Sequence, residues 1–429
     1  MRRRLIGLFM ALALIVAACG DDDSAETTTT AAQTTTTAAE TTTTTGGEDT
    51  TTTAAPATTE APAEIQTINV GAVYSLTGPF ADFAVIYQEG IDLVLDQVNT
   101  ELEQYGYQLA LVYEDSQANP NLGLEAFTKL VNVDDVPVAL IAGGSPVVLA
   151  SLPVAEENGV LVLQTGANSP KLVGASPNLV NVAPTGVLEA QAASGYSYEV
   201  LGHRKMAVVA MNNDFGIPLG EAAADAFEAR GGEIVAVEEY DPTATDFGSV
   251  IAKIRDASPD VVYFASAGPS VAPFIKQSRE RGVEAPFLGN AAFEGPATFE
   301  LAADEGVFWT ALDFGPEKEW ATAFYQDFAD TYGKDPISPA AVQADAIDLI
   351  RDAIVAIAES GGEVTGEAMR DHILSQQSFV GFSGPMFFPA DGNTVRPLAI
   401  RQIQDGAGTR IATFEELEDL GILDFGALD

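Results

Sequence analysis

The sequence has one cysteine, Cys19, and two histidines, His203 and His372. A single cysteine excludes a disulfide framework and a cysteine metal cluster, and it leaves no catalytic thiol in the folded body. Two histidines leave little material for imidazole chemistry. We therefore expect no metal site, no cofactor and no catalytic residues.

Basic residues are also scarce, with 20 Lys and Arg against 62 Asp and Glu and a formal net charge of -42. Beyond the first residues the chain has no basic cluster that would attract a polyanion, which excludes nucleic acid as a partner. The sequence lacks a nucleophile-elbow G-x-S-x-G, a zinc-protease H-E-x-x-H, a phosphate-binding G-x-x-x-x-G-K-[ST] and a dinucleotide G-x-G-x-x-G opening a helix after a strand. We do not expect an enzyme.

The amino terminus has the pattern of a secretory signal over residues 1–18. Three arginines precede an apolar run that is short for a membrane span but matches the hydrophobic region of a signal peptide. Val16-Ala17-Ala18-Cys19 resembles a bacterial lipobox, in which the cysteine becomes the first mature residue and carries lipid. The alternative is a buried cysteine at a helix end. We expect Cys19 to anchor the protein to the outer face of the cell membrane.

Residues 19–64 are dominated by Thr, Ala, Asp, Glu and Pro, and they contain no aromatic side chain. Such a composition cannot bury enough apolar surface to fold. We expect a disordered tether between the lipid and the folded body.

From residue 67 onward, short β-branched runs alternate with longer amphipathic runs, which is typical of parallel sheets with crossover helices. Strands are expected at 68–74, 109–113, 138–142, 160–163, 206–211, 234–239, 261–265 and 307–311, and strand-like segments at 386–388 and 397–404. Helices are expected at 82–103, 120–132, 146–158, 217–230, 247–257, 270–281, 317–332, 340–359 and 366–374. The rhythm restarts near residue 206, so we expect an α/β protein with two doubly wound, Rossmann-like lobes.

Short motifs follow one another in order between residues 68 and 403. They are Val70-Gly71-Ala72, Leu76-Thr77-Gly78-Pro79, Tyr113-Glu114-Asp115, Gly159-Val160-Leu161-Val162, Gly166-Ala167-Asn168-Ser169-Pro170, Asp214-Phe215-Gly216, Asp246-Phe247-Gly248 and Asp260-Val261-Val262-Tyr263. Each is weak alone. Their order and spacing resemble type I periplasmic binding proteins, in the leucine/isoleucine/valine-binding branch that serves ABC importers.

This resemblance implies a clamshell with a three-segment hinge, in which the ligand lies in the cleft and closure presents both lobes to a permease. It places the crossings between lobes near Pro184, Asp313 and Gly381. The N-terminal lobe would comprise residues 65–185 and 312–380, and the C-terminal lobe residues 186–311 and 381–429. We expect a monomer.

Ser145 and Pro146 stand between a strand and a helix, with Ser145 expected as the N-cap and Pro146 as the first helical residue. Backbone N–H groups at such a helix start suit a carboxylate. The resemblance places Ser145 where a hydroxyl and an amide hold the ligand carboxylate. The alternative is a cap without ligand contact.

After the next strand the resemblance places ligand contacts at Gly166, Ala167 and Asn168, with Asn168 in place of the usual Thr. The alternative is a simple turn into a short helix. Phe83 and Phe215 match aromatic positions that flank the ligand from opposite lobes, although aromatic residues at helix starts also serve as core.

Two positions depart from the family pattern. Ala291 stands where the family has a Glu that pairs with the ligand ammonium, and Ala267 stands where it has a cleft Tyr. A buried ammonium without a counter-charge is costly. Either Glu294, Asp214 or Asp313 takes the role of the missing acid, or the ligand is not an α-amino acid.

The sequence therefore predicts a lipid-anchored solute-binding protein of an ABC importer that takes an amino acid or a related small amide or carboxylic acid by hinge closure. The alternative is a sensory ectodomain that reports its ligand to a membrane partner through the same closure.

Overall fold

The computed structural model describes residues 65–301, 303–389 and 394–423, all within one compact unit. The expected signal peptide, Cys19 and the tether lie outside these residues. Within them, no helix combines the length and apolar character needed to cross a membrane.

The first sheet has five parallel strands in the order β2-β1-β3-β4-β5. Its strands are β1 (Gln66–Tyr74), β2 (Tyr107–Asp115), β3 (Val138–Ile141), β4 (Leu161–Gln164) and β5 (Leu179–Asn181). The helices between them are α1 (Ala81–Leu102), α2 (Pro120–Asn132) and α3 (Ser145–Asn158), with single 3₁₀ turns η1 (Glu103–Tyr105) and η2 (Pro170–Leu172). Successive side chains point to opposite faces of a strand. Val70 and Ala72 accordingly join the core under α1, whereas Val73 joins the core under α2 and α3.

The second sheet has seven strands in the order β14-β13-β10-β9-β8-β6-β7. Parallel strands are β6 (Lys205–Met211), β7 (Glu233–Tyr240), β8 (Val261–Ala265), β9 (Phe287–Gly289) and β10 (Val307–Leu312); β13 (Leu398–Gln404) and β14 (Ala407–Ala412) are antiparallel additions. The accompanying helices are α4 (Gly186–Glu199), α5 (Gly216–Glu228), α6 (Gly248–Ala257), α7 (Val271–Glu280), α8 (Pro296–Phe299) and α12 (Phe414–Asp419), with η3 (Gly268–Ser270) and η4 (Ala291–Phe293). Helices α4 and α5 cover one face of this sheet, and α6 and α7 cover the other.

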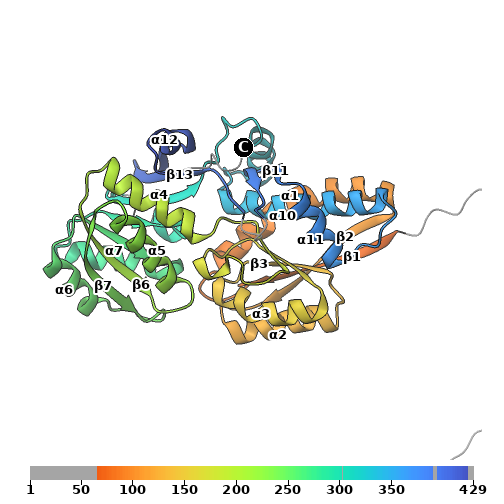
Figure 1. Cartoon of the computed structure of the whole chain (residues 1–429), viewed down its shortest axis with the longest axis horizontal. Coiled ribbons are helices and arrows are strands. Elements are labelled where there is room, and N and C mark those ends of the chain that lie inside the picture. Colours follow the sequence, from red (N-terminus) through yellow and green to blue (C-terminus); the bar gives the residue numbers. More distant parts are fainter. Residues whose placement is uncertain (1–64, 302, 390–393, 424–429) are drawn as a thin grey trace, which may run out of the picture. The chain divides into compact units, whose positions relative to one another are not determined.

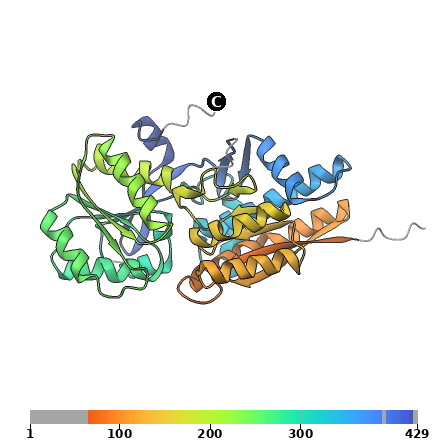
Figure 2. The ribbon, with the colours of Figure 1, turned by 60° about the horizontal axis from the view of Figure 1, so that its bottom comes forward.

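Each sheet with its helices forms a lobe, and Figures 1 and 2 show the two lobes beside each other. We call the five-stranded sheet with its helices the first lobe and the seven-stranded sheet with its helices the second lobe. The architecture is mixed α/β, as the alternation in the sequence predicts.

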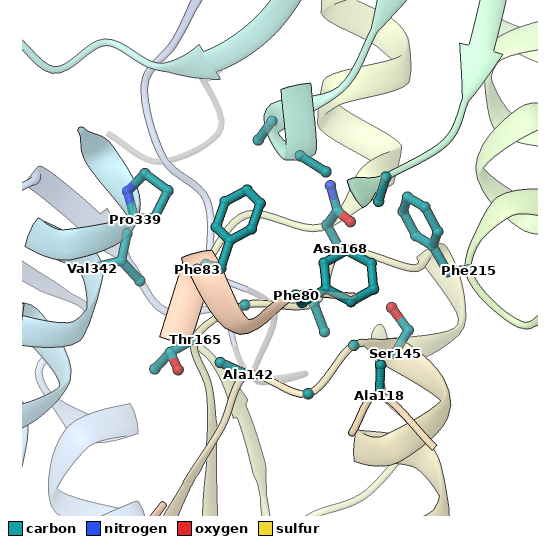
Figure 3. A pocket seen from close by; sticks show the side chains of 18 of the residues that line it. Phe80, Phe83, Ala118, Ala142, Ser145, Thr165, Asn168, Phe215, Pro339 and Val342 are labelled. Atoms are coloured by element: carbon teal, nitrogen blue, oxygen red, sulfur yellow. The ribbon is translucent and has the colours of Figure 1, made fainter. Parts of the chain in front are cut away.

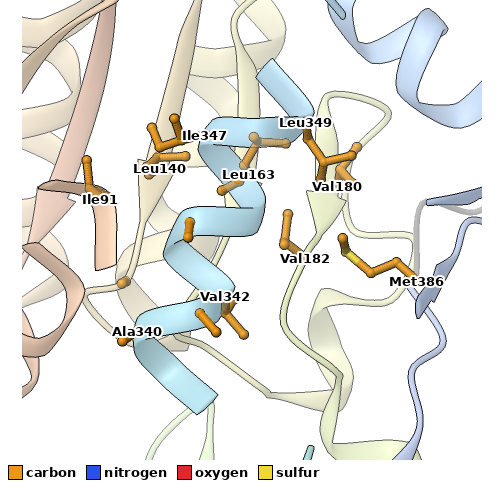
Figure 4. Packing of buried hydrophobic residues seen from close by; sticks show 14 of the residues in the cluster. Ile91, Leu140, Leu163, Val180, Val182, Ala340, Val342, Ile347, Leu349 and Met386 are labelled. Atoms are coloured by element: carbon orange, nitrogen blue, oxygen red, sulfur yellow. The ribbon is translucent and has the colours of Figure 1, made fainter. Parts of the chain in front are cut away.

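Three late helices, α9 (Thr322–Tyr332), α10 (Ser338–Glu359) and α11 (Gly366–Ser375), follow without strands between them. Helix α10 packs along α1 over the first sheet, and its Val342, Ile347 and Leu349 join the same core (Figure 4). The approach is close enough to require Gly90, because a Cβ there would lie 2.0 Å from the carbonyl oxygen of Ala340. This packing places the late helices on the first lobe.

The chain passes between the lobes in three places. Two are the links from β5 to α4 and from β10 to α9. The third follows the hairpin of β11 (Ser378–Gly381) and β12 (Gly384–Phe387) and leads to β13. Gly381 lies within β11, where a Cβ would meet Asp345 of α10 at 2.2 Å, so it belongs against the first lobe. The lobe limits at residues 185, 312 and 380 stay a prediction.

Candidate functional site

A cavity of about 170 Å³ lies at the carboxyl ends of the strands, between the lobes (Figure 3). Parallel α/β sheets bind ligands at this edge. The volume is below the roughly 300–1,000 Å³ of drug-sized ligand sites, so the cavity suits a smaller metabolite. Residues that line it include Phe80, Phe83, Tyr87, Gly144, Ser145, Thr165, Gly166, Ala167, Asn168, Glu189, Met211, Asn213, Phe215, Ala267, Ala291, Ala292, Leu312, Ser338, Pro339 and Val342.

The structure brings eight of the nine residues expected at the ligand site to this one cavity. They are Phe83, Ser145, Gly166, Ala167, Asn168, Phe215, Ala267 and Ala291. Only Glu294 does not line it. That these residues touch a ligand stays a prediction.

The expectation that Ser145 is an N-cap is wrong. Helix α3 begins at Ser145 and its N-cap is Gly144, whose φ of 94° is one that glycine adopts without strain. Pro146 is the second helical residue, and the Ser145 hydroxyl instead accepts the amide of Ser169 at 3.1 Å. The amides of Val147 and Val148 already donate to the Gly144 carbonyl. The amides of Gly144 and Ser145 are therefore those that this helix start can offer to a ligand.

Aromatic rings of the first lobe form one wall of the cavity and reach the second lobe. Phe83 lies between Phe80 and Tyr87, with ring centroids 6.4 and 6.0 Å away. A Cβ on Gly295 would lie 2.3 Å from the Phe83 ring, and one on Gly268 would lie 2.6 Å from the Phe80 ring. Both rings therefore rest directly on second-lobe backbone, so the lobes are closed on each other.

Phe215 supplies the second lobe's aromatic side chain. It is the N-cap residue of α5, and Asn213 Oδ1 accepts the amides of Phe215 and Gly216 at 3.0 and 2.8 Å. This turn fixes the backbone that carries the ring. The ring is 6% exposed and offers apolar contact without a hydrogen bond.

None of the three acids named as one alternative for the missing glutamate lines the cavity. Glu294 is buried, but its carboxylate accepts the Ser338 hydroxyl and pairs with Arg401 at 3.4 Å. Asp313 is held by Lys318 and Arg410 at 2.8 and 2.7 Å. The Asp214 side chain is 54% exposed and pairs with Lys171. Each of these three carboxylates is therefore already paired with a Lys or Arg side chain.

Glu189, in the first turn of α4, is the acid that sequence reasoning missed. Its side chain is fully buried and lines the cavity. Oε2 accepts Asn168 Nδ2 at 2.7 Å and the Ala291 amide at 3.4 Å, whereas Oε1 has no partner among the described residues. Burial raises the pKa of Glu189 to about 8, and the charge of Glu294 adds to the rise, against the two hydrogen bonds.

The described residues contain no group of three or more His, Cys, Asp and Glu that could hold a metal ion. His372 lies beside Asp352 at 2.9 Å on the packed helices α11 and α10 of the first lobe, and His203 contacts the Ser197 hydroxyl at 3.0 Å. Neither histidine lines the cavity.

Two α/β lobes closed over a small cavity at their strand ends define a bilobed solute-binding protein. A model of the periplasmic binding protein family matches residues 67–408, and the chain belongs to that family. The Leu/Ile/Val-binding protein BraC3 of Rhizobium johnstonii is 26% identical over 315 residues, which are 72% of this chain and 82% of that protein.

Solved structures share the fold. The Streptococcus pneumoniae branched-chain amino acid binding protein LivJ, in complex with isoleucine, has a TM-score of 0.71 at 21% identity and covers 81% of this chain and 100% of its own. A solute-binding protein of an R. palustris ABC transporter, in complex with benzoate, has a TM-score of 0.71 at 20% identity, with coverage of 81% and 96%.

These findings confirm the resemblance that the motifs predict and the type I periplasmic binding protein fold. The protein is a solute-binding protein of the periplasmic binding protein family, similar to the Leu/Ile/Val-binding proteins; it is not an enzyme, and its family acts outside the cytoplasm.

Proposed function

We propose that the protein captures an amino acid, or a related small amide or carboxylic acid, and delivers it to the permease of an ABC importer. The observation that carries this proposal is the cavity itself, which takes its walls from both lobes. A ligand that contacts both lobes favours the closed state over the open one by its extra contacts. Capture therefore needs no covalent step.

Polar contacts between the lobes support closure as the physical event. The Ser169 hydroxyl of the first lobe donates to the Asp214 carbonyl of the second at 2.6 Å, and Lys171 pairs with the Asp214 carboxylate at 2.7 Å. Ser338 of α10 donates to Glu294 of the second lobe. These hydrogen bonds and this ion pair join the two lobes, and the rings of Phe80 and Phe83 cover the cavity.

The start of α3 supports a ligand with a carboxylate. The amides of Gly144 and Ser145 have no hydrogen-bond partner among the described residues and border the cavity, and the helix dipole adds partial positive charge at this end of a helix of 14 residues. Isoleucine and benzoate, bound by the two solved relatives, share a carboxylate and an apolar body. The apolar rings and Met211, Leu312 and Val342 suit such a body.

The sequence supports lipid attachment at Cys19 and a tether over residues 19–64, which would keep the binding protein near its permease. We assign the two lobes to residues 65–185 with 312–380 and to residues 186–311 with 381–429.

Thermal denaturation of the purified mature protein tests the proposal against a panel of amino acids, their amides and small carboxylic acids. We expect at least one compound to raise Tm in a concentration-dependent way and to shrink the radius of gyration in solution scattering. If no compound on the panel raises Tm, the proposed function is wrong.

A further inference from the structure

Glu189 is the only Asp or Glu among the described residues that line the cavity, and no Lys, Arg or His lines it. Its side chain is fully buried, and Oε1 has no hydrogen-bond partner in the described part of the chain. A buried charge is normally paired, because desolvation penalises it otherwise. Among the described residues, this carboxyl group therefore has one oxygen without a hydrogen-bond partner and no cationic side chain beside it in the cavity.

The neighbours of Glu189 hold it in place for such a partner. Asn168, from the loop after β4, and the amide of Ala291, from the turn after β9, both donate to Oε2. Two donors on one oxygen favour the ionised carboxylate, and Oε1 is left buried without a partner among the described residues. Ala291 carries no acid of its own, so its backbone supports Glu189 at the point where the resemblance expects a glutamate side chain.

We propose that Glu189 binds a cationic nitrogen of the ligand through Oε1, so that the ligand is a zwitterion held by Glu189 at one end and by the start of α3 at the other. This inference rests on the proposed function and specifies the ligand within it. The carboxylate of the ligand faces the amides of Gly144 and Ser145, and its apolar body contacts the rings of Phe83 and Phe215. Glu189 thereby makes the protein bind amino acids more tightly than nitrogen-free acids of the same shape.

The competing arrangement keeps Glu189 protonated and fills the cavity with a nitrogen-free carboxylic acid. In that case Glu189 would donate a hydrogen bond, and a glutamine would serve nearly as well. The number of protons released on binding distinguishes the two arrangements. A cationic nitrogen binds the ionised carboxylate, so its binding releases the proton that Glu189 holds below pH 8. The titratable neighbours Glu294 and Tyr263 are buried and are not ligand contacts in either arrangement.

Isothermal titration of the mature protein tests this with matched ligand pairs, L-leucine against 4-methylpentanoate and L-phenylalanine against 3-phenylpropionate. The variants are Glu189→Gln and, as a control, Glu199→Gln, an exposed acid on the same helix. We expect an amino acid to bind the wild type and the control alike, and Glu189→Gln to weaken it by about 100-fold. The nitrogen-free partner should bind Glu189→Gln at least as well as wild type.

Titration in buffers of different ionisation enthalpy adds a readout that needs no variant. We expect release of about one proton per amino acid bound at pH 6.5. Tight binding of a nitrogen-free acid without proton release, or an amino-acid affinity within threefold of wild type in Glu189→Gln, overturns the role of Glu189 and leaves the proposed function intact. If neither member of any pair binds and the wider panel also fails, the proposed function falls with it.

Discussion

The side-chain amide of Asn168 lies 2.7 Å from Oε2 of Glu189, and the two residues belong to different lobes. Asn168 follows β4 of the first lobe, whereas Glu189 lies in α4, which packs on the second. This hydrogen bond crosses the hinged cleft beside the cavity. Under the proposed function, closure would therefore order the buried acid at the same time as it encloses the ligand.

The pKa of Glu189 predicts how stability depends on pH without ligand. Because burial raises this pKa to about 8 from 4.5, the folded state binds the proton more tightly than the unfolded state. The stability that the bound proton contributes to the folded state is fully present below pH 4.5 and is lost as pH rises to 8. Glu189→Gln, which cannot ionise, should therefore gain up to about 5 kcal/mol over wild type at pH 8.5 and almost nothing near pH 4.5. Calorimetry at both pH values checks this.

Glu199→Gln is the control for that comparison, and it should follow the wild type at both pH values. A Glu189→Gln variant that is less stable than wild type at pH 8.5 would contradict the account of a carboxylate buried without a cation.

Gly295→Ala should hinder closure without harming either lobe. Its backbone φ of -109° accepts alanine, but the added Cβ would lie 2.3 Å from the Phe83 ring in the closed state. We expect ligand affinity to fall by about tenfold, which corresponds to about 1.4 kcal/mol, with an unchanged Tm for the unliganded protein. Titration and thermal denaturation measure the two quantities.

A second substitution tests whether Phe83 is the cause. Phe83→Leu removes the ring, so the double variant with Gly295→Ala should lose less affinity than the sum of the single losses. Strict additivity of the two losses would show that the ring and the glycine do not meet in the bound state.

Gly90→Ala should destabilise the first lobe by roughly 2–4 kcal/mol, because its Cβ would overlap the Ala340 carbonyl and force α1 and α10 apart. Val85→Ala, at a position of α1 that is 53% exposed, is the control and should change stability by less than about 1 kcal/mol. Urea denaturation compares the two. A stable Gly90→Ala protein would be inconsistent with the packing of α10 on α1.

Cys19→Ser should release the protein from the membrane if Cys19 carries the lipid. We expect the wild type in the membrane fraction of producing cells and the variant in the soluble extracytoplasmic fraction. Mass spectrometry of the mature amino terminus should find diacylglycerol on Cys19, and an unmodified Cys19 in the membrane fraction would contradict the assignment.

The regular strand–helix–strand units could be predicted from the sequence because, in these segments, the spacing of apolar residues and the residue composition indicate the same type of element. The range 120–132 was predicted as a helix and is α2, and the range 261–265 was predicted as a strand and is β8. Helix α4 was not predicted because most of its own residues are small or apolar. Its sequence therefore does not show the regular spacing of polar and apolar residues that indicates a helix. Short strands such as β5 and β9, with three residues each, carry too little pattern to be found.

Most of the residues that the sequence analysis named line the cavity, but the one acid that lines it was not among them. Motif order located Ser145, Asn168 and Phe215, since each follows a strand that the pattern had found. Glu189 lies in the helix that was missed, and its role depends on contacts with residues 21 and 102 positions away. No local signal could separate it from Glu294, because only the folded chain shows that Ser338 and Arg401 already engage Glu294.

A crystal structure of the mature protein with the tightest-binding compound of the panel tests the central claim most directly. We predict one ligand enclosed between the lobes, with its carboxylate at the amides of Gly144 and Ser145 and Phe83 still resting on Gly295. A ligand bound outside this cavity, or lobes that stay apart when the ligand is bound, would contradict it.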